Sequence, residues 1–112
     1  MRWIRGSGPK NPPAVKPHVF HPAADEEYVQ AVQYYADIAL ELGCRFHDEM
    51  ERLIGEACAN PERFWKFSPP ARRHLSRDFS YAIVFLEKPD HIWVVAVMNM
   101  KRRPGYWRER LG

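Results

Sequence analysis

The stretch that decides the fold is Phe79-Ser80-Tyr81-Ala82-Ile83-Val84-Phe85-Leu86. Successive side chains of a β-strand point to opposite faces of its sheet. One side of this stretch carries Phe79, Tyr81, Ile83 and Phe85, and the other carries Ala82, Val84 and Leu86. Because a strand that is apolar on both sides is typical of the middle of a sheet, we predict a central β-strand here.

Two further strands are predicted beside the central one. Glu87-Lys88-Pro89-Asp90 has the composition of a tight turn, and residues 91–99 beyond it are rich in valine and apolar on both sides. Before the central strand, residues 72–77 form a basic candidate strand around Leu75, and Asp78 marks a turn or bulge. The three strands together predict an antiparallel sheet.

An amphipathic helix is predicted near the N-terminus of the domain. Pro22 and the acids at positions 25–27 are typical of a helix start, since acidic side chains there complement the helix dipole. Gly43 is expected to end this helix. Apolar residues repeat between them at steps of three and four, namely Ala24, Tyr28, Ala31, Tyr35, Ile38 and Leu42.

A second helix is predicted directly after the first. Its apolar face consists of Phe46, Met50, Leu53 and Ala57. Asn60-Pro61 is expected to end it. Because the link between the two helices is very short, they should form an antiparallel hairpin.

The order of these elements predicts an α+β fold. His18-Val19-Phe20 is expected to form an edge strand, because prolines flank it. The fold is then an N-terminal helical hairpin packed on a twisted antiparallel sheet of three to four strands. Residues 1–17 are basic and rich in proline, so we expect a flexible tail there and a single domain at residues 18–112.

Two groups of residues are expected to serve packing only. Phe64, Trp65 and Phe67 should hold the irregular segment after the second helix against the core. Cys44 and Cys58 lie 14 residues apart in one predicted helix, which separates them by roughly 21 Å. That distance excludes a disulfide. Two cysteines without clustered histidines are also a poor metal site, so we expect no metal and no cofactor.

Charge divides the chain into an acidic middle and a basic second half. Residues 23–60 carry nine acidic and two basic side chains, and residues 61–112 carry eleven basic and five acidic ones. The basic half could meet nucleic acid or an acidic protein. The acids of the helices are expected to form a solvated face rather than a catalytic or metal group, because neighbours one or two apart do not face each other: Asp37, Glu41, Asp48, Glu49, Glu51 and Glu56.

The chain contains no apolar run near the ~20 residues of a membrane span and no apolar core of a signal peptide. We therefore expect a cytoplasmic protein without a membrane partner.

The C-terminal stretch from Lys101 to Arg110 contains five basic residues, together with Tyr106 and Trp107. Guanidinium groups bind phosphates through paired hydrogen bonds. The two aromatic rings could stack on bases or pack under the last turn. The candidate residues for binding a target or nucleic acid are Arg72, Lys101, Arg102, Arg103, Trp107 and Arg108.

Three segments follow one another along the chain: Pro22 to Glu27 with Ala31 to Tyr35, Asn60 to Phe64 with Arg72-Arg73, and Phe79 to Phe85 with Ala96-Val97 and Arg102 to Trp107. Taken in this order, they resemble the RelE/ParE superfamily of type II toxin–antitoxin toxins, especially its ParE-like, plasmid-stabilisation branch. The resemblance covers about residues 18–110, and its most specific part is the C-terminal arginine–proline–glycine–tyrosine–tryptophan signature.

The resemblance implies a small toxin that arrests the growth of its own cell until an antitoxin binds it. In this family the C-terminal segment of the antitoxin typically wraps the toxin, and the pair often represses its own operon, so operator DNA would be bound only through the antitoxin complex. RelE-like members cut messenger RNA in the ribosome. ParE-like members poison DNA gyrase and have no recognised hydrolytic site.

Cleavage of RNA through its 2′-hydroxyl needs a base, an acid and cations around the phosphate. Arginine is a poor proton shuttle because it stays protonated, which leaves His74 and Tyr106 as candidate shuttles. Many ParE-like relatives have a histidine where this chain has Asn99, which cannot titrate, and this departure weakens the nuclease hypothesis. The candidate catalytic residues, if the chain is a nuclease, are Arg73, His74, Arg77, Arg103 and Tyr106.

Three hypotheses follow. The first is a ParE-like toxin that poisons DNA gyrase by protein contact and has no catalysis of its own. The second is a RelE-like, ribosome-dependent endoribonuclease. The third is a non-toxic binding module that retains the fold.

Overall fold

The computed structural model describes residues 15–112, so most of the expected tail lies outside the described residues. The last residues of that tail contact the domain. The Lys16 amide donates a hydrogen bond to the Cys58 carbonyl (3.3 Å), and the Pro17 carbonyl accepts one from the Ile92 amide (2.9 Å). The described structure therefore continues to the N-terminal side of the first strand.

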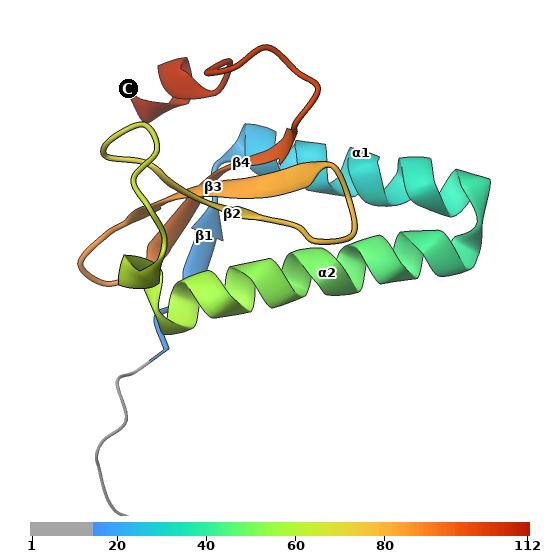
Figure 1. Cartoon of the computed structure of the whole chain (residues 1–112), viewed down its shortest axis with the longest axis horizontal. Helices are drawn as coiled ribbons and strands as arrows, with labels where there is room; N and C mark the ends of the chain where they lie inside the picture. Colours follow the sequence, from blue (N-terminus) through green and yellow to red (C-terminus); the bar gives the residue numbers. More distant parts are fainter. Residues whose placement is uncertain (1–14) are drawn as a thin grey trace, which may run out of the picture.

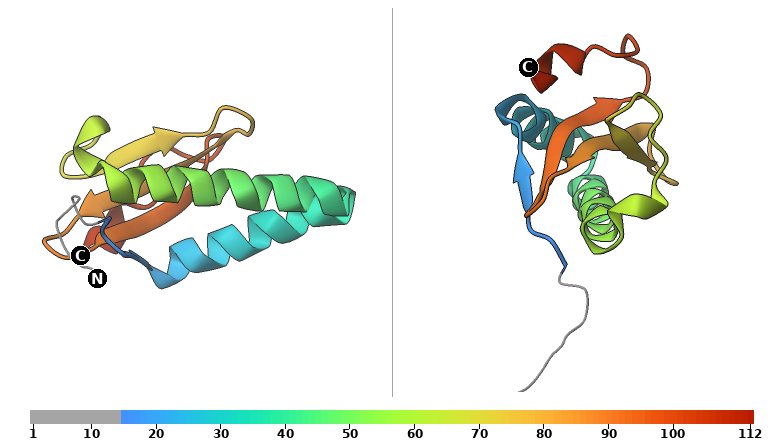
Figure 2. Two further views of the ribbon diagram at one scale, coloured as in Figure 1. Left: turned by 90° about the horizontal axis from the view of Figure 1, so that it is seen from below. Right: turned by 90° about the vertical axis from the view of Figure 1, so that its left-hand side faces the viewer.

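The described residues form a helical hairpin on a four-stranded sheet, followed by a C-terminal segment (Figure 1). Seen from below, both helices lie in front of the sheet (Figure 2). The elements are β1 (His18–Phe20), α1 (Pro22–Ile38), α2 (Leu40–Ala59), the 3₁₀ turn η1 (Pro61–Arg63), β2 (Arg72–Leu75), β3 (Tyr81–Glu87), β4 (Ile92–Asn99) and the 3₁₀ turn η2 (Arg108–Leu111).

The strand order is β1-β4-β3-β2. β3 is antiparallel to both neighbours, and Ile83 pairs with Val97 on one side and His74 on the other. The predicted central strand and the predicted edge position of β1 are confirmed. The sheet is mixed rather than antiparallel throughout, because β1 runs parallel to β4. Parallel neighbours need a long crossover connection, which the helical hairpin and the β2–β3 pair provide.

The prediction that Gly43 ends the first helix is wrong. α1 ends at Ile38, and the extended backbone of Ala39 (φ −160°, ψ 131°) turns the chain directly into α2. Gly43 lies inside α2, where an added Cβ atom would come within 2.6 Å of the Ala36 Cβ. The glycine therefore allows the two helices to approach closely.

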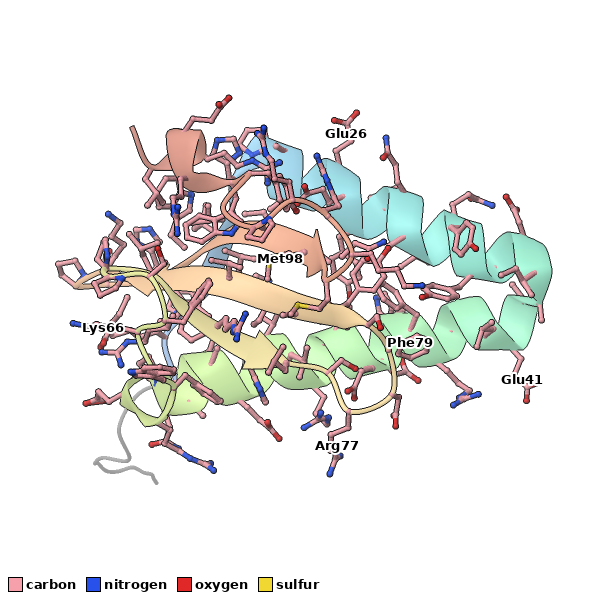
Figure 3. All side chains as sticks on the ribbon, turned by 45° about the horizontal axis from the view of Figure 1, so that its top comes forward. Glu26, Glu41, Lys66, Arg77, Phe79 and Met98 are labelled. Atoms are coloured by element: carbon pink, nitrogen blue, oxygen red, sulfur yellow. The ribbon has the colours of Figure 1, made fainter. Side chains whose placement is uncertain are left out.

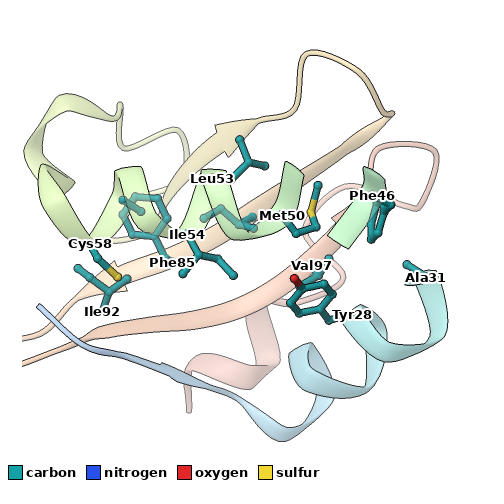
Figure 4. Packing of buried hydrophobic residues seen from close by; sticks show 12 residues of the cluster. Tyr28, Ala31, Phe46, Met50, Leu53, Ile54, Cys58, Phe85, Ile92 and Val97 are labelled. Atoms are coloured by element: carbon teal, nitrogen blue, oxygen red, sulfur yellow. The ribbon is translucent and has the colours of Figure 1, made fainter. Parts of the chain in front are cut away.

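The main core lies between the helical hairpin and one face of the sheet (Figure 4). This core confirms the predicted apolar face of α2. It also confirms the N-terminal part of the predicted apolar face of α1. Ile38, at the far end of α1, is exposed instead. The buried residues of this core are Tyr28, Ala31, Phe46, Met50, Leu53, Ile54, Ala57, Cys58, Ile83, Phe85, Ile92 and Val97.

A second core covers the opposite face of the sheet. Trp107 is fully buried in it, and Phe67, Tyr106 and Leu111 pack against its edge. The C-terminal segment and the segment before β2 thus form a second layer, which explains why β3 and β4 are apolar on both sides. The buried residues are Ala71, Ala82, Val84, Leu86, Val95, Ala96, Met98 and Trp107.

Two of the expected packing roles are wrong. Trp65 is 80% exposed and does not hold its segment on the core, whereas Phe64 and Phe67 do. Both cysteines lie in α2 and are free, but only Cys58 is buried, and Cys44 is exposed.

The close approach of the two helices predicts opposite effects for one substitution at two sites of α2. Gly43→Ala should lower the free energy of unfolding by about 1–3 kcal/mol, because overpacking forces the helices apart. Gly55→Ala is the matched control. No atom lies within 4 Å of a Cβ built there, and alanine should stabilise the helix by roughly 0.5–1 kcal/mol. Equal effects in chemical denaturation would contradict this account of Gly43.

Candidate functional site

The Glu27 carboxylate, in the second turn of α1, collects hydrogen bonds from the C-terminal segment. Arg110 donates to both of its oxygens (3.0 and 2.8 Å), and the Tyr106 hydroxyl donates at 2.9 Å. Arg102 adds a longer contact of 3.3 Å. We call these four residues the Glu27 cluster. Paired hydrogen bonds between guanidinium and carboxylate are among the stronger polar contacts in proteins.

The Glu27 cluster also completes the open edge of β4. β1 pairs only with the first half of β4, so later backbone groups on this side have no strand partner. The Val97 amide donates instead to Glu27 (3.1 Å), and the Val95 carbonyl accepts from Arg110 (3.0 Å). Buried backbone groups require such partners. Two side chains therefore take the place of the missing strand.

Tyr106 is held as a neutral hydrogen-bond donor. Its ring lies 3.7 Å from the Arg102 guanidinium carbon and 5.1 Å from that of Arg110. Burial, followed by the hydrogen bond to Glu27 and the negative charge of that carboxylate, raises the pKa of Tyr106 well above its ordinary value. The phenol is therefore poorly suited to act as a general base near neutral pH.

A second polar cluster joins α2 to β2. Arg52 donates to both oxygens of Glu49 (2.8 and 3.0 Å) and to Glu56 (3.1 Å). Glu56 in turn lies 2.7 Å from His74 Nε2, and the Ser76 hydroxyl donates to Glu49 at 2.7 Å. The expectation of a solvated acidic face is therefore wrong for Glu49, which is buried, whereas Glu56 stays 43% exposed while it contacts His74 of β2.

Glu49 is the acid of this cluster with the most strongly shifted pKa. Its side chain is only 7% exposed. The hydrogen bond from Arg52 lowers the pKa of Glu49 to about 2, with help from Ser76 and the Arg77 amide and against the opposing effect of burial. Glu49 is thus a charged structural group.

Neighbouring candidate catalytic residues of β2 lie on opposite faces of the sheet. His74 pairs with Ile83 of the main core and faces α2, whereas Arg73 pairs with Val84 of the second core. The Arg73 guanidinium carbon lies 4.6 Å from the centre of the Phe67 ring. Arg73 and His74 therefore cannot act together on one phosphate.

The other three candidates are also apart. Arg77 is exposed in the β2–β3 connection, where its side chain points outward (Figure 3), and Arg103 is exposed in the C-terminal segment. Tyr106 lies in the Glu27 cluster at the β1 side of β4, and β3 separates β4 from β2. The structure does not bring the five predicted catalytic residues into one site.

The predicted binding residues are placed in two ways. Lys101, Arg102, Arg103 and Arg108 are exposed on the C-terminal segment. Arg72 is mostly buried and donates to the Phe64 carbonyl at 2.7 Å. Trp107 is fully buried, so of the two roles considered for it, packing under the last turn is the one found, and stacking on a ligand is not.

The residues that sequence reasoning missed are Glu27, Arg110 and the Glu49 network. The pattern of a helix start does not distinguish Glu27 from the neighbouring acids Asp25 and Glu26. A usable signal was its position, because Glu27 lies three residues after Ala24 and four before Ala31 and so falls on the apolar face of its own helix.

The helical hairpin carries an exposed apolar surface, which we call the hairpin groove. It consists of two adjoining hollows of about 340 and 230 Å³ that share Val32 and His47. Val29 and Leu40 on its rim are exposed. Its lining residues include Phe20, Tyr28, Val29, Val32, Ala36, Leu40 and Cys44. An exposed apolar groove of this kind fits the apolar face of a partner helix.

Residues 15–112 contain neither a metal-binding cluster nor a membrane-spanning helix. Within this range, His, Cys, Asp and Glu side chains nowhere gather in groups of three or more that could hold a metal ion. Neither helix of the described part combines the length and the apolar character needed to cross a membrane.

No protein-family model and no curated protein matches the sequence. Among solved structures, the fold is similar to that of a chain from the "Chromosomal ParDE TA system from P. aeruginosa". The TM-score is 0.68, the identity is 9%, and the match covers 78% of this chain and 98% of the other. The expected RelE/ParE toxin-like fold is thereby confirmed.

The Glu27 cluster predicts how a neutral replacement would act. Glu27→Gln should lower the free energy of unfolding by about 2–4 kcal/mol, because Arg110 would keep a largely buried charge without its carboxylate. Trypsin should also cut the C-terminal segment faster. Glu26→Gln, at an exposed neighbouring position, is the control and should leave both measurements unchanged. Equal proteolysis of the two variants would contradict a holding role for Glu27.

The lowered pKa of Glu49 predicts a loss of stability in acid. The pKa is about 2 in the folded protein and about 4.3 when the chain is unfolded. The stabilisation is therefore complete above pH ~4.5 and is lost as the pH falls toward ~2, with a size of about 3 kcal/mol. Glu49→Gln should flatten this part of the stability–pH curve. Asp48→Asn, at an exposed acid, should not.

Proposed function

We propose that this chain is the toxin of a type II toxin–antitoxin module, inhibits growth until an antitoxin binds it, and acts in a ParE-like manner on DNA gyrase. The observation that carries the proposal is a fold shared across 98% of a chain from a ParDE toxin–antitoxin structure. The three sequence segments of the RelE/ParE resemblance support it. They fall in order on α1, on the η1–β2 region and on β3, β4 and the C-terminal segment.

The geometry favours protein contact over RNA cleavage. A nuclease needs a base, an acid and cations around one phosphate, whereas Arg73 and His74 face opposite sides of the sheet. His74 is hydrogen-bonded to Glu56, and the Tyr106 hydroxyl donates a hydrogen bond to Glu27. The endoribonuclease hypothesis therefore ranks second. The hypothesis of a non-toxic binding module predicts no growth defect at all.

The hairpin groove is the surface that we assign to the antitoxin. It is apolar, exposed and shaped by two helices, which suits an amphipathic segment of the antitoxin that buries its apolar face there. Operator DNA would then be reached only through the antitoxin. A module of this kind acts on cytoplasmic targets, so we place the chain in the cytoplasm.

The first test is induced expression in bacteria that carry a DNA-damage-response reporter. Stalled gyrase leaves double-strand breaks, so growth arrest with an active reporter is the expected result. Arrest with a silent reporter would move the proposal to messenger RNA cleavage. Unchanged growth, with the folded chain present at high level, would leave only the non-toxic binding module.

The assignment of the hairpin groove predicts a variant that escapes its antitoxin. Leu40→Glu places a charge on the rim of the groove and should prevent the product of a neighbouring antitoxin gene from restoring growth, while toxicity persists. Ile38→Glu is the matched control, since Ile38 is similarly exposed but does not line the groove. Rescue of both variants would refute the assignment.

A further inference from the structure

Trp65 is the most exposed large apolar side chain of residues 15–112, at 80%. Tryptophan is rarely left in water, because its large ring gains more than most side chains from burial. Exposed tryptophans are also enriched among the residues that dominate protein–protein binding. The exposure of Trp65 therefore indicates an interaction surface.

The backbone on both sides of Trp65 is fixed. The Phe64 carbonyl accepts a hydrogen bond from Arg72 (2.7 Å), and the Phe64 ring lies 4.4 Å from the His74 ring, centre to centre. Phe67 packs in the second core, where the centre of its ring lies 5.7 Å from that of the Trp107 ring. Trp65 is thus presented by an anchored segment, which limits the entropy that a partner would have to overcome.

Cationic side chains lie within the segment that carries Trp65 and against its neighbours Phe67 and Ser68. Lys66 follows Trp65 directly, Arg73 covers the Phe67 ring, and Arg108 donates to the Ser68 hydroxyl at 3.2 Å. Glu62 is the only acidic residue between positions 61 and 77, and Glu87 lines the same pocket as Lys66. We call the exposed residues Arg63, Trp65 and Lys66, together with Arg73 and Arg108 that contact the same segment, the Trp65 face.

The Trp65 face is distinct from the tip of the hairpin. Figure 3 shows Lys66 at one end of the molecule and Glu41, near the start of α2, at the other. One end is aromatic and cationic, and the hairpin is apolar with acidic flanks. Two surfaces of such different chemistry fit two different partners.

We propose that Trp65 is the principal contact of this chain with its target protein, and that it enters an apolar pocket of DNA gyrase rimmed by carboxylates. The inference rests on the proposed function, because that function supplies the partner. A protein is favoured over single-stranded nucleic acid because stacking platforms use several exposed rings. Here Phe64 and Phe67 are turned inward, which leaves one ring free to enter a pocket.

The test measures how purified chains trap gyrase on DNA. Gyrase holoenzyme and supercoiled plasmid are titrated with wild type, Trp65→Ala, Trp65→Phe and Tyr34→Ala, and cleaved complexes are quantified. Trp65→Ala should need at least about 30-fold more protein, as expected when a dominant aromatic contact is removed. Trp65→Phe should recover most of the activity. Tyr34→Ala is the control, because it removes an exposed aromatic ring from α1.

The outcomes separate the inference from the function on which it rests. If wild type traps gyrase and Trp65→Ala traps it equally well, the inference is wrong and the proposed function stands. If wild type traps no gyrase, the proposed function is wrong, and the inference about Trp65 is wrong with it because gyrase is not the partner. Unfolding of each variant by denaturant confirms that the fold is intact, which an exposed position should allow.

A second measurement distinguishes protein from nucleic acid as the partner. A fluorescent single-stranded oligonucleotide is titrated with wild type and Trp65→Ala in the absence of gyrase. We expect the two chains to bind it equally, since only ionic contacts from the neighbouring cations are involved. A loss of tenfold or more in Trp65→Ala would assign the ring to base stacking and would overturn the proposed protein pocket.

Discussion

The carboxylate of Glu27 is the interaction on which the arrangement of the molecule depends. It is reached by a backbone amide of β4 and by side chains of the C-terminal segment, so it joins α1, the sheet and the second layer at one point. Without this carboxylate the two guanidinium groups near it would repel each other. The basic C-terminal segment can therefore lie against the sheet because one acid neutralises part of its charge.

This arrangement explains how a small chain buries both faces of its sheet. The helical hairpin covers one face, and a few residues around Trp107 cover the other. Side chains of the Glu27 cluster satisfy the edge of β4, so no further strand is required there. This arrangement also leaves apolar side chains exposed, because Val29, Leu40 and Trp65 belong to neither core.

The sequence predicted secondary structure correctly where apolar residues repeat at one regular spacing. The alternation around Ile83 predicted a central strand, and the helical repeats predicted the hairpin. The sequence was not informative where a residue serves a tertiary contact. Gly43 permits close helix packing, and Glu49 accepts a hydrogen bond from Ser76, directly after β2. The candidate catalytic residues share a suitable chemical type, but chemical type says nothing about position. Arg73 and His74 are neighbours in a strand and therefore face opposite sides of the sheet.

The parallel pairing of β1 with β4 has a consequence for the order of assembly. His18 pairs with Ile92, and Glu27 binds Arg110 across 83 positions of the chain. Contacts so distant in sequence close late in folding, whereas neighbouring helices associate early. During synthesis the hairpin can therefore form while the C-terminal cations are still inside the ribosome. The exposed apolar surface of the hairpin would then exist before the C-terminal segment has joined the sheet.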